Sequence, residues 1–343
     1  MIFITGGAGF IGSNFIINWF KQFSEPVLNI DKLTYAGNEK NLESLATNKN
    51  YIFSRTDITD EKAIAELFHK YKPRALLNFA AESHVDRSIT GPGEFIKTNI
   101  VGTFNLLQCA KDYWQGLEKT EKDSFVFLHV STDEVYGSLS VDDAAFTEVT
   151  PYAPNSPYSA SKASSDHLVR AYHHTYGLPT VTTNCSNNYG PLQFPEKLIP
   201  LVLHNCLKGK PLPIYGDGLN VRDWLYVTDH CEAILQVLEN GEAGETYNVG
   251  GWNEMKNMEV VDLICKTLDQ LRPRQDGKSY LTQKTFVPDR LGHDRRYAID
   301  ASKIEQDLGW KPKETFATGI QKTVKWYLDN EAWVEGVLKR NQK

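Results

Sequence analysis

Residues 125–137 read Phe-Val-Phe-Leu-His-Val-Ser-Thr-Asp-Glu-Val-Tyr-Gly, and the interpretation of the whole chain starts from them. The first half is an apolar run, which is typical of a strand buried on both faces of a parallel sheet. A hydroxyl and two carboxylates follow at once, in Thr132, Asp133 and Glu134. Ligands of open parallel sheets bind beyond the carboxyl ends of the strands. The stretch therefore predicts a functional site, although an isolated Asp-Glu pair is more often a solvated loop.

The N-terminal segment predicts a dinucleotide-binding loop. Residues 2–4 form a short apolar strand, and Gly6, Gly9 and Gly12 then lead into a helix. Glycines let the backbone turn tightly and approach a pyrophosphate, which the helix N-terminus stabilises. Asp31 ends the next strand and lies nineteen residues after Gly12, close to the spacing of about 20 for an acid that binds the adenosine ribose. This carboxylate would repel a 2′-phosphate, so we expect NAD rather than NADP; an ordinary strand–helix turn is the alternative.

The alternation of strands and helices continues beyond Asp31. Further strands are predicted at 51–53 and 75–79, and a helix begins after Asp60. This rhythm predicts an α/β protein with a Rossmann-type, doubly wound parallel sheet. We expect a dinucleotide-binding domain over residues 1–185, to which parts of about 221–250 return. Residues 186–343 are expected to form mainly a smaller α/β substrate-binding lobe.

Composition excludes several classes of protein. The 343 residues include 37 Lys and Arg against 43 Asp and Glu, a net charge of −6 that argues against binding nucleic acid. No apolar run reaches the roughly 18 residues of a membrane span, and the strand that follows Met1 leaves no room for a signal peptide. The five cysteines are scattered without a metal-binding spacing, so we expect reduced thiols, a cytoplasmic location and no metal.

A second catalytic signal lies at residues 156–177. Ser156 is a plausible helix N-cap, Pro157 suits the first helical position and Gly177 suits the end. Tyr158 and Lys162 are then one turn apart on one face. A nearby ammonium, together with a cationic nicotinamide, favours the tyrosine phenolate, so the pair could accept a proton beside a hydride acceptor. Tyr-x-x-x-Lys also occurs by chance on many helices.

Several motifs together resemble the extended short-chain dehydrogenase/reductase family, and within it the dTDP-glucose 4,6-dehydratases. They are TGGAGFIG at 5–12, DKLTYAGN at 31–38, AESHVDRS at 81–88, STDEVYG at 131–137, and Tyr158-x-x-x-Lys162. The resemblance covers about residues 1–335. The segment between Gly137 and Phe146 is shorter than in many relatives, and the chain ends at Lys343 without the tail that many carry. Both differences could alter the pocket rim or the edges of a dimer.

The resemblance implies NAD as cofactor, dTDP-glucose as substrate, a homodimer formed through two helices of the first lobe, and a place in dTDP-rhamnose or deoxysugar biosynthesis. The implied catalytic residues are Thr132, Asp133, Glu134, Tyr158 and Lys162. The implied cofactor-binding residues are Gly6, Gly9, Phe10, Ile11, Gly12, Asp31, Lys32, Thr34, Asp57, Ile58, Ala80, Ala81, Ser83, Asn99, Tyr158 and Lys162. The implied substrate-binding residues are Ser83, His84, Thr132, Asn187, Glu196, Lys197, Leu198, Arg222, Asn257, Arg290 and His293.

The second lobe offers its own signal for an anionic substrate. Arg290, His293, Arg295 and Arg296 crowd one short segment of an acidic protein. Such a cluster is often a solvated face, but guanidinium groups also bind diphosphate oxygens bidentately. After a nucleotide-binding first lobe, we expect an anion site here.

Three other functions remain open at this point. A UDP-glucose 4,6-dehydratase would differ only in the nucleotide base that its substrate carries. The single methyl group of thymine gives roughly 1–3 kcal/mol of discrimination between the two substrates. A nucleotide-sugar 4-epimerase shares the glycine loop and the Tyr/Lys pair, but it needs no acid–base pair for C5 and C6. A catalytically silent NAD-binding scaffold would be expected to lack Tyr158, Lys162 or the carboxylates. The adjacent Asp133 and Glu134 favour a dehydratase.

Overall fold

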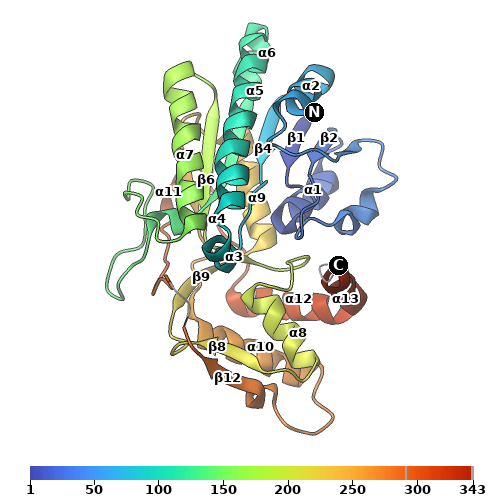
Figure 1. Cartoon of the computed structure of the whole chain (residues 1–343), viewed down its shortest axis with the longest axis vertical. Helices are drawn as coiled ribbons and strands as arrows, with labels where there is room; N and C mark the ends of the chain where they lie inside the picture. The colour runs from blue at the N-terminus through green and yellow to red at the C-terminus, as the bar shows by residue number, and fades with distance from the viewer. Residues whose placement is uncertain (290–291, 341–343) are drawn as a thin grey trace.

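A seven-stranded sheet forms the larger lobe of the protein (Figure 1). The computed structural model describes residues 1–289 and 292–340. The strand order is β10-β6-β5-β4-β1-β2-β3, and all the neighbouring pairs are parallel. The strands are β1 (Ile2–Thr5), β2 (Val27–Ile30), β3 (Tyr51–Ser54), β4 (Ala75–Asn78), β5 (Val126–Thr132), β6 (Thr180–Cys185) and β10 (Thr246–Val249). The predicted Rossmann-type parallel sheet is confirmed.

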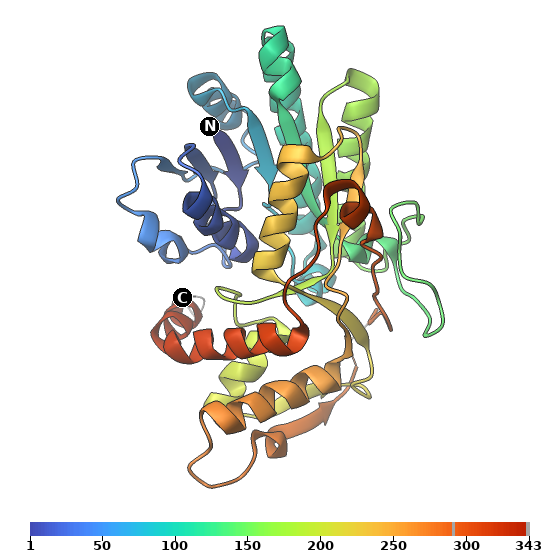
Figure 2. The same ribbon diagram turned by 180° about the vertical axis from the view of Figure 1, so that it is seen from behind.

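Helices cover both faces of this sheet. The face seen in Figure 2 carries α1 (Phe10–Gln22), α9 (Val227–Asn240) and α11 (Ser302–Leu308). The opposite face carries α2 (Glu61–Tyr71), α5 (Thr103–Gln115) and α7 (Pro157–Tyr176). Shorter helices connect these elements: η1 (Glu39–Leu45), α3 (Val85–Thr90), α4 (Pro92–Phe95), η2 (Ile96–Gly102), α6 (Lys119–Ser124) and η3 (Asp133–Tyr136).

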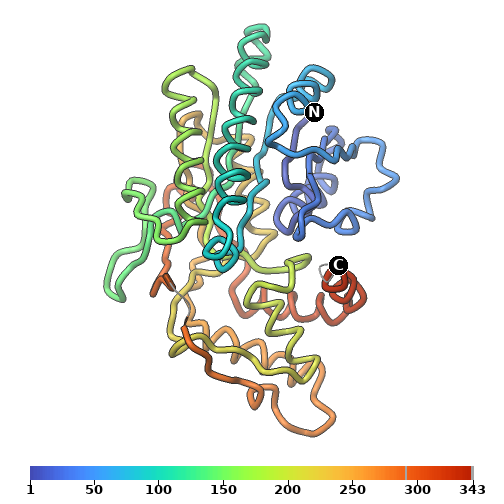
Figure 3. Tube along the Cα trace, in the orientation of Figure 1, coloured from blue at the N-terminus to red at the C-terminus, as the bar shows by residue number. Residues whose placement is uncertain are grey.

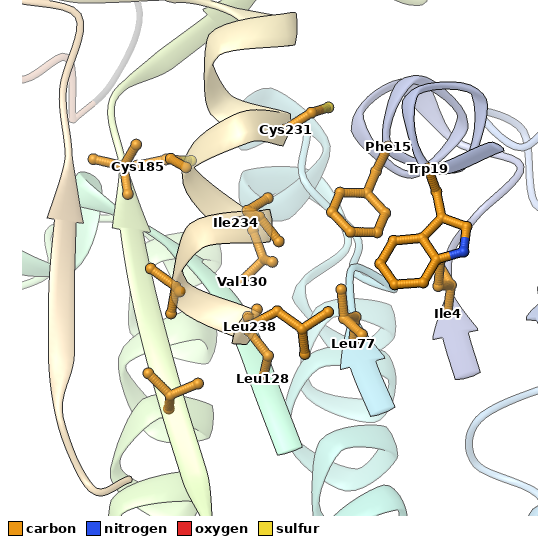
Figure 4. Packing of buried hydrophobic residues seen from close by; sticks show 14 of the residues in the cluster. Ile4, Phe15, Trp19, Leu77, Leu128, Val130, Cys185, Cys231, Ile234 and Leu238 are labelled. Atoms are coloured by element: carbon orange, nitrogen blue, oxygen red, sulfur yellow. The ribbon is translucent and has the colours of Figure 1, made fainter. Parts of the chain in front are cut away.

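Alternate residues of the strands supply the two halves of the core. Ile2 and Ile4 of β1 pack with α1 and α9, whereas Phe3 packs on the other side with α2 and α5. Successive strand side chains point to opposite faces, so a strand buried on both faces is apolar throughout. Figure 4 shows Phe15 and Trp19 of α1 and Ile234 and Leu238 of α9 packed together with Ile4, Leu77, Leu128 and Val130 of the strands.

The smaller lobe has a separate apolar core and lies beyond the carboxyl ends of the strands (Figure 1). Its helices are α8 (Leu198–Leu207), α10 (Asn257–Leu271), η4 (Tyr280–Gln283), α12 (Phe316–Asp329) and α13 (Glu331–Arg340). Its strands are β7 (Asn187–Tyr189), β8 (Leu212–Tyr215), β9 (Val221–Tyr226), β11 (Glu254–Lys256) and β12 (Lys284–Val287). They form the sheets β11-β9-β7 and β12-β8.

The chain crosses between the lobes more than once. After β9 it returns to the large sheet as α9 and β10, and α11 later packs against both. Figure 3 shows the last helix close to the N-terminal segment that follows β2. This packing supports the domain division expected from the sequence, which stays a proposal, and it adds α11 to the returning elements. No helix in the described part of the chain is long and apolar enough to cross a membrane.

Candidate active site

A single cleft brings together residues from most of the predicted motifs. It lies between the carboxyl ends of the large sheet and the 185–197 segment, which crosses to the smaller lobe. Its lining includes the following predicted residues: Gly6, Gly9, Phe10, Ile11, Gly12, Asp31, Lys32, Thr34, Ile58, Ala80, Ala81, Ser83, Thr132, Glu134, Tyr158, Lys162, Asn187, Glu196 and Lys197. Strands β1 and β4 are neighbours here although they are far apart in sequence, which is the strand-order reversal where doubly wound sheets bind ligands.

The glycine loop forms a cradle without space for side chains. Gly6 has a φ of +68°, and a Cβ atom on it would lie 2.7 Å from the Ala80 backbone. A Cβ atom on Gly12 would lie 2.5 Å from the Gly6 carbonyl oxygen. The loop can therefore be built only from residues without a side chain at these points, and it opens directly onto the N-terminus of α1. A loop of this form fits a dinucleotide pyrophosphate.

Asp31 lies at the end of β2, on the edge of this cradle. Its carboxylate accepts hydrogen bonds from the backbone amides of Ala8, at 2.9 Å, and Leu33, at 2.8 Å. Burial raises the pKa of Asp31, and these two hydrogen bonds act in the opposite direction. The carboxylate is therefore fixed in position beside the glycine loop, where a ribose would lie.

Two predicted cofactor residues do not line the cleft. Asp57 forms an ion pair with Lys32 at 3.3 Å, and its Oδ1 accepts a hydrogen bond from the Thr59 backbone amide. Burial acts to raise the pKa of Asp57, but these interactions outweigh it and lower the pKa. Asn99 bonds both backbone groups of Glu82 and donates to the Ser161 hydroxyl at 2.8 Å. Asn99 therefore joins the segment after β4 to α7, and its assignment as a cofactor ligand stays a prediction.

The two adjacent carboxylates follow β5 and meet different surroundings. Glu134 lines the cleft. Asp133 is 1% exposed; its Oδ1 accepts from the Thr132 hydroxyl, and its buried Oδ2 has no hydrogen-bond partner among the described residues. Burial raises the pKa of Asp133 well above its ordinary value, and the Glu134 and Asp223 carboxylates add to the effect. This direction favours the neutral form of Asp133, which can donate a proton.

Tyr158 and Lys162 lie on the first turns of α7, as predicted. Ser156 caps the helix, Pro157 is its first residue, and Gly177 follows its end with a φ of +75°. Burial, together with the Glu134 carboxylate, raises the pKa of Tyr158 well above its ordinary value. From the sequence we expected Lys162 to lower the pKa of Tyr158. The structure gives the opposite direction because the phenol is buried, which the sequence could not show. Within the chain alone, the neutral phenol is the favoured form.

The far wall of the cleft joins the two lobes. Lys197 donates a hydrogen bond to the Ser83 carbonyl at 2.8 Å, and Glu196 accepts one from the Tyr35 hydroxyl at 2.9 Å. Arg87 stacks on the Tyr35 ring, 3.7 Å from its centroid, and lies 3.3 Å from Glu196. Sequence reasoning missed Tyr35 and Arg87, although both lie within the quoted motifs.

Four of the other predicted substrate residues lie outside the lining of the cleft. His84 has its Nε2 atom 3.9 Å from Glu196, and Leu198 begins α8. The Arg222 guanidinium stacks on Tyr297 and donates to the carbonyls of Val221 and Asp294. Asn257 begins α10 with its Oδ1 buried and unbonded among the described residues, as is the Oδ1 of Asn187. Buried amide oxygens without a hydrogen-bond partner could accept a hydrogen bond from a bound ligand.

The basic cluster at 290–296 is partly neutralised by acidic residues. His293 pairs with Asp289 at 2.6 Å, Arg295 with Asp217 at 2.9 Å and Arg296 with Glu254 at 2.7 Å. Arg290, predicted to bind substrate, lies outside the described residues. The sequence could not show that acids from two other segments, Asp217 and Glu254, meet this cluster, so the anion site stays a prediction.

Comparisons with known proteins agree with this arrangement. The family model described as GDP-mannose 4,6 dehydratase matches residues 3–323. A curated dTDP-glucose 4,6-dehydratase from Xanthomonas campestris is 62% identical over 98% of this chain and 95% of its own length. The dTDP-glucose 4,6-dehydratase 1 of Escherichia coli is 58% identical over the same shares. A crystal structure of the Streptomyces venezuelae dTDP-glucose 4,6-dehydratase, with NAD and dTDP bound, has a TM-score of 0.89 at 45% identity, covering 98% of this chain and 99% of that one.

These matches extend over nearly the whole chain and include both lobes. They confirm the resemblance that the sequence motifs indicated. The chain therefore belongs to the family that the GDP-mannose 4,6 dehydratase model describes, among the dTDP-glucose 4,6-dehydratases of the extended short-chain dehydrogenase/reductases.

Proposed function

We propose that this protein is an NAD-dependent dTDP-glucose 4,6-dehydratase, a hydro-lyase that converts dTDP-glucose into dTDP-4-keto-6-deoxyglucose and water. The observation that carries the proposal is the buried acid Asp133 beside Glu134, beyond β5 and next to Tyr158. Relatives at 62% and 58% identity carry this name. The product is a precursor for dTDP-rhamnose or another deoxysugar.

The residues of the first lobe fit the cofactor. The glycine cradle would hold the pyrophosphate, and Asp31 would accept hydrogen bonds from the adenosine ribose. Lys162, 4% exposed and lining the same cleft, would bind near the nicotinamide end. Bound NAD supplies a hydride acceptor and later a hydride donor at the sugar.

The chemistry explains why an oxidation is needed in a reaction without net redox change. The C5 hydrogen of glucose is not acidic, but it becomes acidic once C4 is a ketone. Tyr158 takes the O4 proton as C4 is oxidised, and to do so it must be the phenolate, the form that the Lys162 ammonium and the positive charge of bound NAD would favour. Thr132 and Lys162 orient the reacting groups. General acids and bases of this kind typically contribute about 10²–10⁴-fold each.

The two carboxylates perform the elimination. Glu134 takes the C5 proton, and neutral Asp133 gives its proton to the departing O6 hydroxyl, so that water leaves. C6 is then reduced, and Glu134 returns a proton to C5. The proton that Tyr158 accepted balances the one that Asp133 gave up. The raised pKa of Asp133 supports its role as the acid.

Product analysis tests the proposal against its rivals. We would incubate the purified protein separately with dTDP-glucose and UDP-glucose and measure the 4-keto product by its absorbance in alkali. We expect much more product from dTDP-glucose. Equal or greater product from UDP-glucose would change the substrate, and absence of product from both would favour the epimerase or the silent scaffold.

We also infer a homodimer. Four large apolar side chains are exposed on the adjoining elements α3, η2 and α5: Ile89, Ile96, Val101 and Phe104. A second copy of the chain would cover them, in keeping with the resemblance. A cytoplasmic location is supported by the five cysteines, all of which are free and buried.

A further inference from the structure

The catalytic helix carries a third buried polar residue at the same spacing. Tyr158, Lys162 and Asp166 are each four residues apart on α7, so they share one face of the helix. All three are less than 9% exposed. The reaction gives roles to the first two, whereas Asp166 neither lines the cleft nor has a part in the proposed chemistry. A carboxylate in such a position requires a reason, because burying an unpaired charge is costly.

Two residues of the neighbouring strand β5 lie against the Asp166 carboxylate. Its Oδ2 accepts a hydrogen bond from the Ser131 hydroxyl at 2.8 Å. Its Oδ1 lies 3.3 Å from Nε2 of His129, which is completely buried. The carboxylate is therefore fixed between the helix and the strand, below the floor of the cleft.

A chain of hydrogen bonds sets the orientation of the His129 ring. The Ala80 amide donates to the Thr5 hydroxyl, which donates to Oδ1 of Asn78 at 2.6 Å. The Nδ2 group of Asn78 is then the donor to Nδ1 of His129, at 3.1 Å. A neutral imidazole that accepts at Nδ1 carries its hydrogen on Nε2, which faces Asp166. Burial and the Lys162 ammonium lower the pKa of His129 to about 4, so the ring is neutral at physiological pH.

Lys162 lies beside this pair. Its Nζ donates to the Val130 carbonyl at 2.9 Å and lies 3.4 Å from Nε2 of His129. Burial lowers the pKa of Lys162, and the Asp166 carboxylate raises it. Cys185 of β6 and Tyr158 also face this region, and Tyr136 and Tyr152 face Asp166. Burial raises the pKa of all four groups, which keeps them neutral.

We propose that Asp166 is a positioning residue that acts through Lys162. Its carboxylate is the counter-ion that keeps the buried ammonium protonated, and the neutral His129 ring lies against both groups, with its Nε2 atom 3.3 Å from the carboxylate and 3.4 Å from the ammonium. The inference rests on the proposed function, in which Lys162 must be a cation to orient the cofactor and Tyr158. The floor of the cleft is thereby tied to the glycine loop, because the same hydrogen-bond chain reaches Thr5.

The pH profile of turnover tests the proposal. Asp166→Asn removes the charge at nearly constant shape. The pKa of Lys162 then falls, so the ammonium is lost at a lower pH as the pH rises. An opposite charge typically shifts a pKa by one to three units. We therefore expect the alkaline limb of kcat to move down by about one pH unit, with turnover about tenfold lower on that limb and close to wild type at lower pH.

Two further variants serve as comparisons. Asp329→Asn removes an exposed carboxylate at the end of α12, and its profile should match the wild type. His129→Gln keeps an acceptor toward Asn78 and a donor toward Asp166, so its alkaline limb should stay in place. An unshifted limb for Asp166→Asn would overturn the proposal. An equal shift of the alkaline limb for His129→Gln would also overturn the proposal, because the titrating group would then be the His129 imidazole.

Thermal unfolding gives a second test that needs no substrate. If Asp166→Asn folds poorly, the double variant Lys162→Met/Asp166→Asn should melt at a higher temperature than Lys162→Met, because neither buried charge is then left alone. A double variant that melts at or below the temperature of Lys162→Met would contradict the counter-ion role. Failure of the wild type to turn over dTDP-glucose would instead contradict the proposed function.

Discussion

Asp133 and Glu134 are adjacent in sequence but differ in their surroundings. Asp133 is enclosed beneath the cleft, whereas Glu134 faces into it. Pairs of acids in different environments can serve one as acid and the other as base. A one-residue step at the end of β5 therefore separates the two functions that an elimination of water requires.

Replacing each carboxyl group by an amide should stop the elimination. We expect Asp133→Asn and Glu134→Gln each to lower the kcat for 4-keto product by about 10²–10⁴-fold. A steady-state assay with dTDP-glucose measures the effect, and Asp329→Asn is the matched control. Wild-type rates in both variants would show that these carboxyl groups have other roles.

The same Asp133→Asn substitution should stabilise the fold. The folded-state pKa of Asp133 is raised above the unfolded value. The contribution of Asp133 to stability is therefore greatest below the unfolded pKa, near 3.9, and is lost as the pH rises toward the folded value. The amide has no such loss. We therefore expect the melting temperature of Asp133→Asn to exceed that of the wild type increasingly from pH 4 upward, by calorimetry. A difference that does not change with pH would contradict burial of a neutral acid.

At the scale of the element, helix α7 sets the position of the catalytic pair. The Ser156 hydroxyl accepts from the Ser159 amide at 3.0 Å, and the Ser159 hydroxyl accepts from the Ser156 amide at 3.0 Å. This capping box fixes the first turn, in which Tyr158 is the second residue. The position of the Tyr158 phenol thus depends on an N-cap residue, Ser156, that does not itself line the cleft.

Removing the cap should weaken both stability and turnover. We expect Ser156→Ala to lower the free energy of unfolding by about 1 kcal/mol, because the Ser159 amide loses its partner. Turnover should also fall as the first turn frays. Ser156→Thr keeps a capping hydroxyl and serves as the control in denaturant melts. Equal stabilities of the alanine and threonine variants would contradict the role of the cap.

The sequence predicted the features that local chemistry determines. Ser156, Pro157 and Gly177 gave the bounds of α7, and the glycine spacing located the cradle. It could not predict features that depend on distant segments meeting in the fold. Examples are the role of Asn99, bonded to Glu82 and Ser161, and the acids that neutralise Arg295 and Arg296. Asp166 was visible as a third residue at helical spacing, but its partners on β5 were not.

At the scale of the whole molecule, the C-terminal helix reaches the cofactor cradle. The Trp333 indole donates to Oδ1 of Asn41 at 2.9 Å, and the Nδ2 group of Asn41 donates to the Ala8 carbonyl at 3.0 Å. Arg340 donates to the carbonyls of Thr34 and Gly37. Residues separated by almost the whole chain therefore hold one side of the cleft together.

Loss of the indole hydrogen bond should loosen NAD binding. Trp333→Phe keeps most of the apolar packing but leaves Asn41 without this donor, a change of about 1 kcal/mol. We expect a Kd for NAD about fivefold higher by calorimetric titration of the cofactor-free protein. Trp252→Phe alters an exposed tryptophan elsewhere and should leave the Kd unchanged. Unchanged affinity in Trp333→Phe would limit α13 to a role in stability.

A charge in the exposed apolar patch should separate the proposed dimer. Phe104 is 46% exposed on α5, and we expect Phe104→Glu to sediment as a monomer in analytical ultracentrifugation where the wild type sediments as a dimer. Val149→Glu places the same charge on a different exposed apolar residue and should remain dimeric. A dimeric Phe104→Glu variant, or a monomeric wild type, would contradict the assignment of this surface.

Isotope transfer within the sugar tests the central claim most directly. The claim is that C4 is oxidised transiently and that the same hydrogen returns at C6 after water has left. We would supply dTDP-glucose labelled with deuterium at C4 and locate the label in the product by NMR. The account predicts a 4-keto-6-deoxy sugar with deuterium at C6. A product that retains deuterium at C4, as an epimerase would give, or a 6-deoxy product without the label, would contradict it.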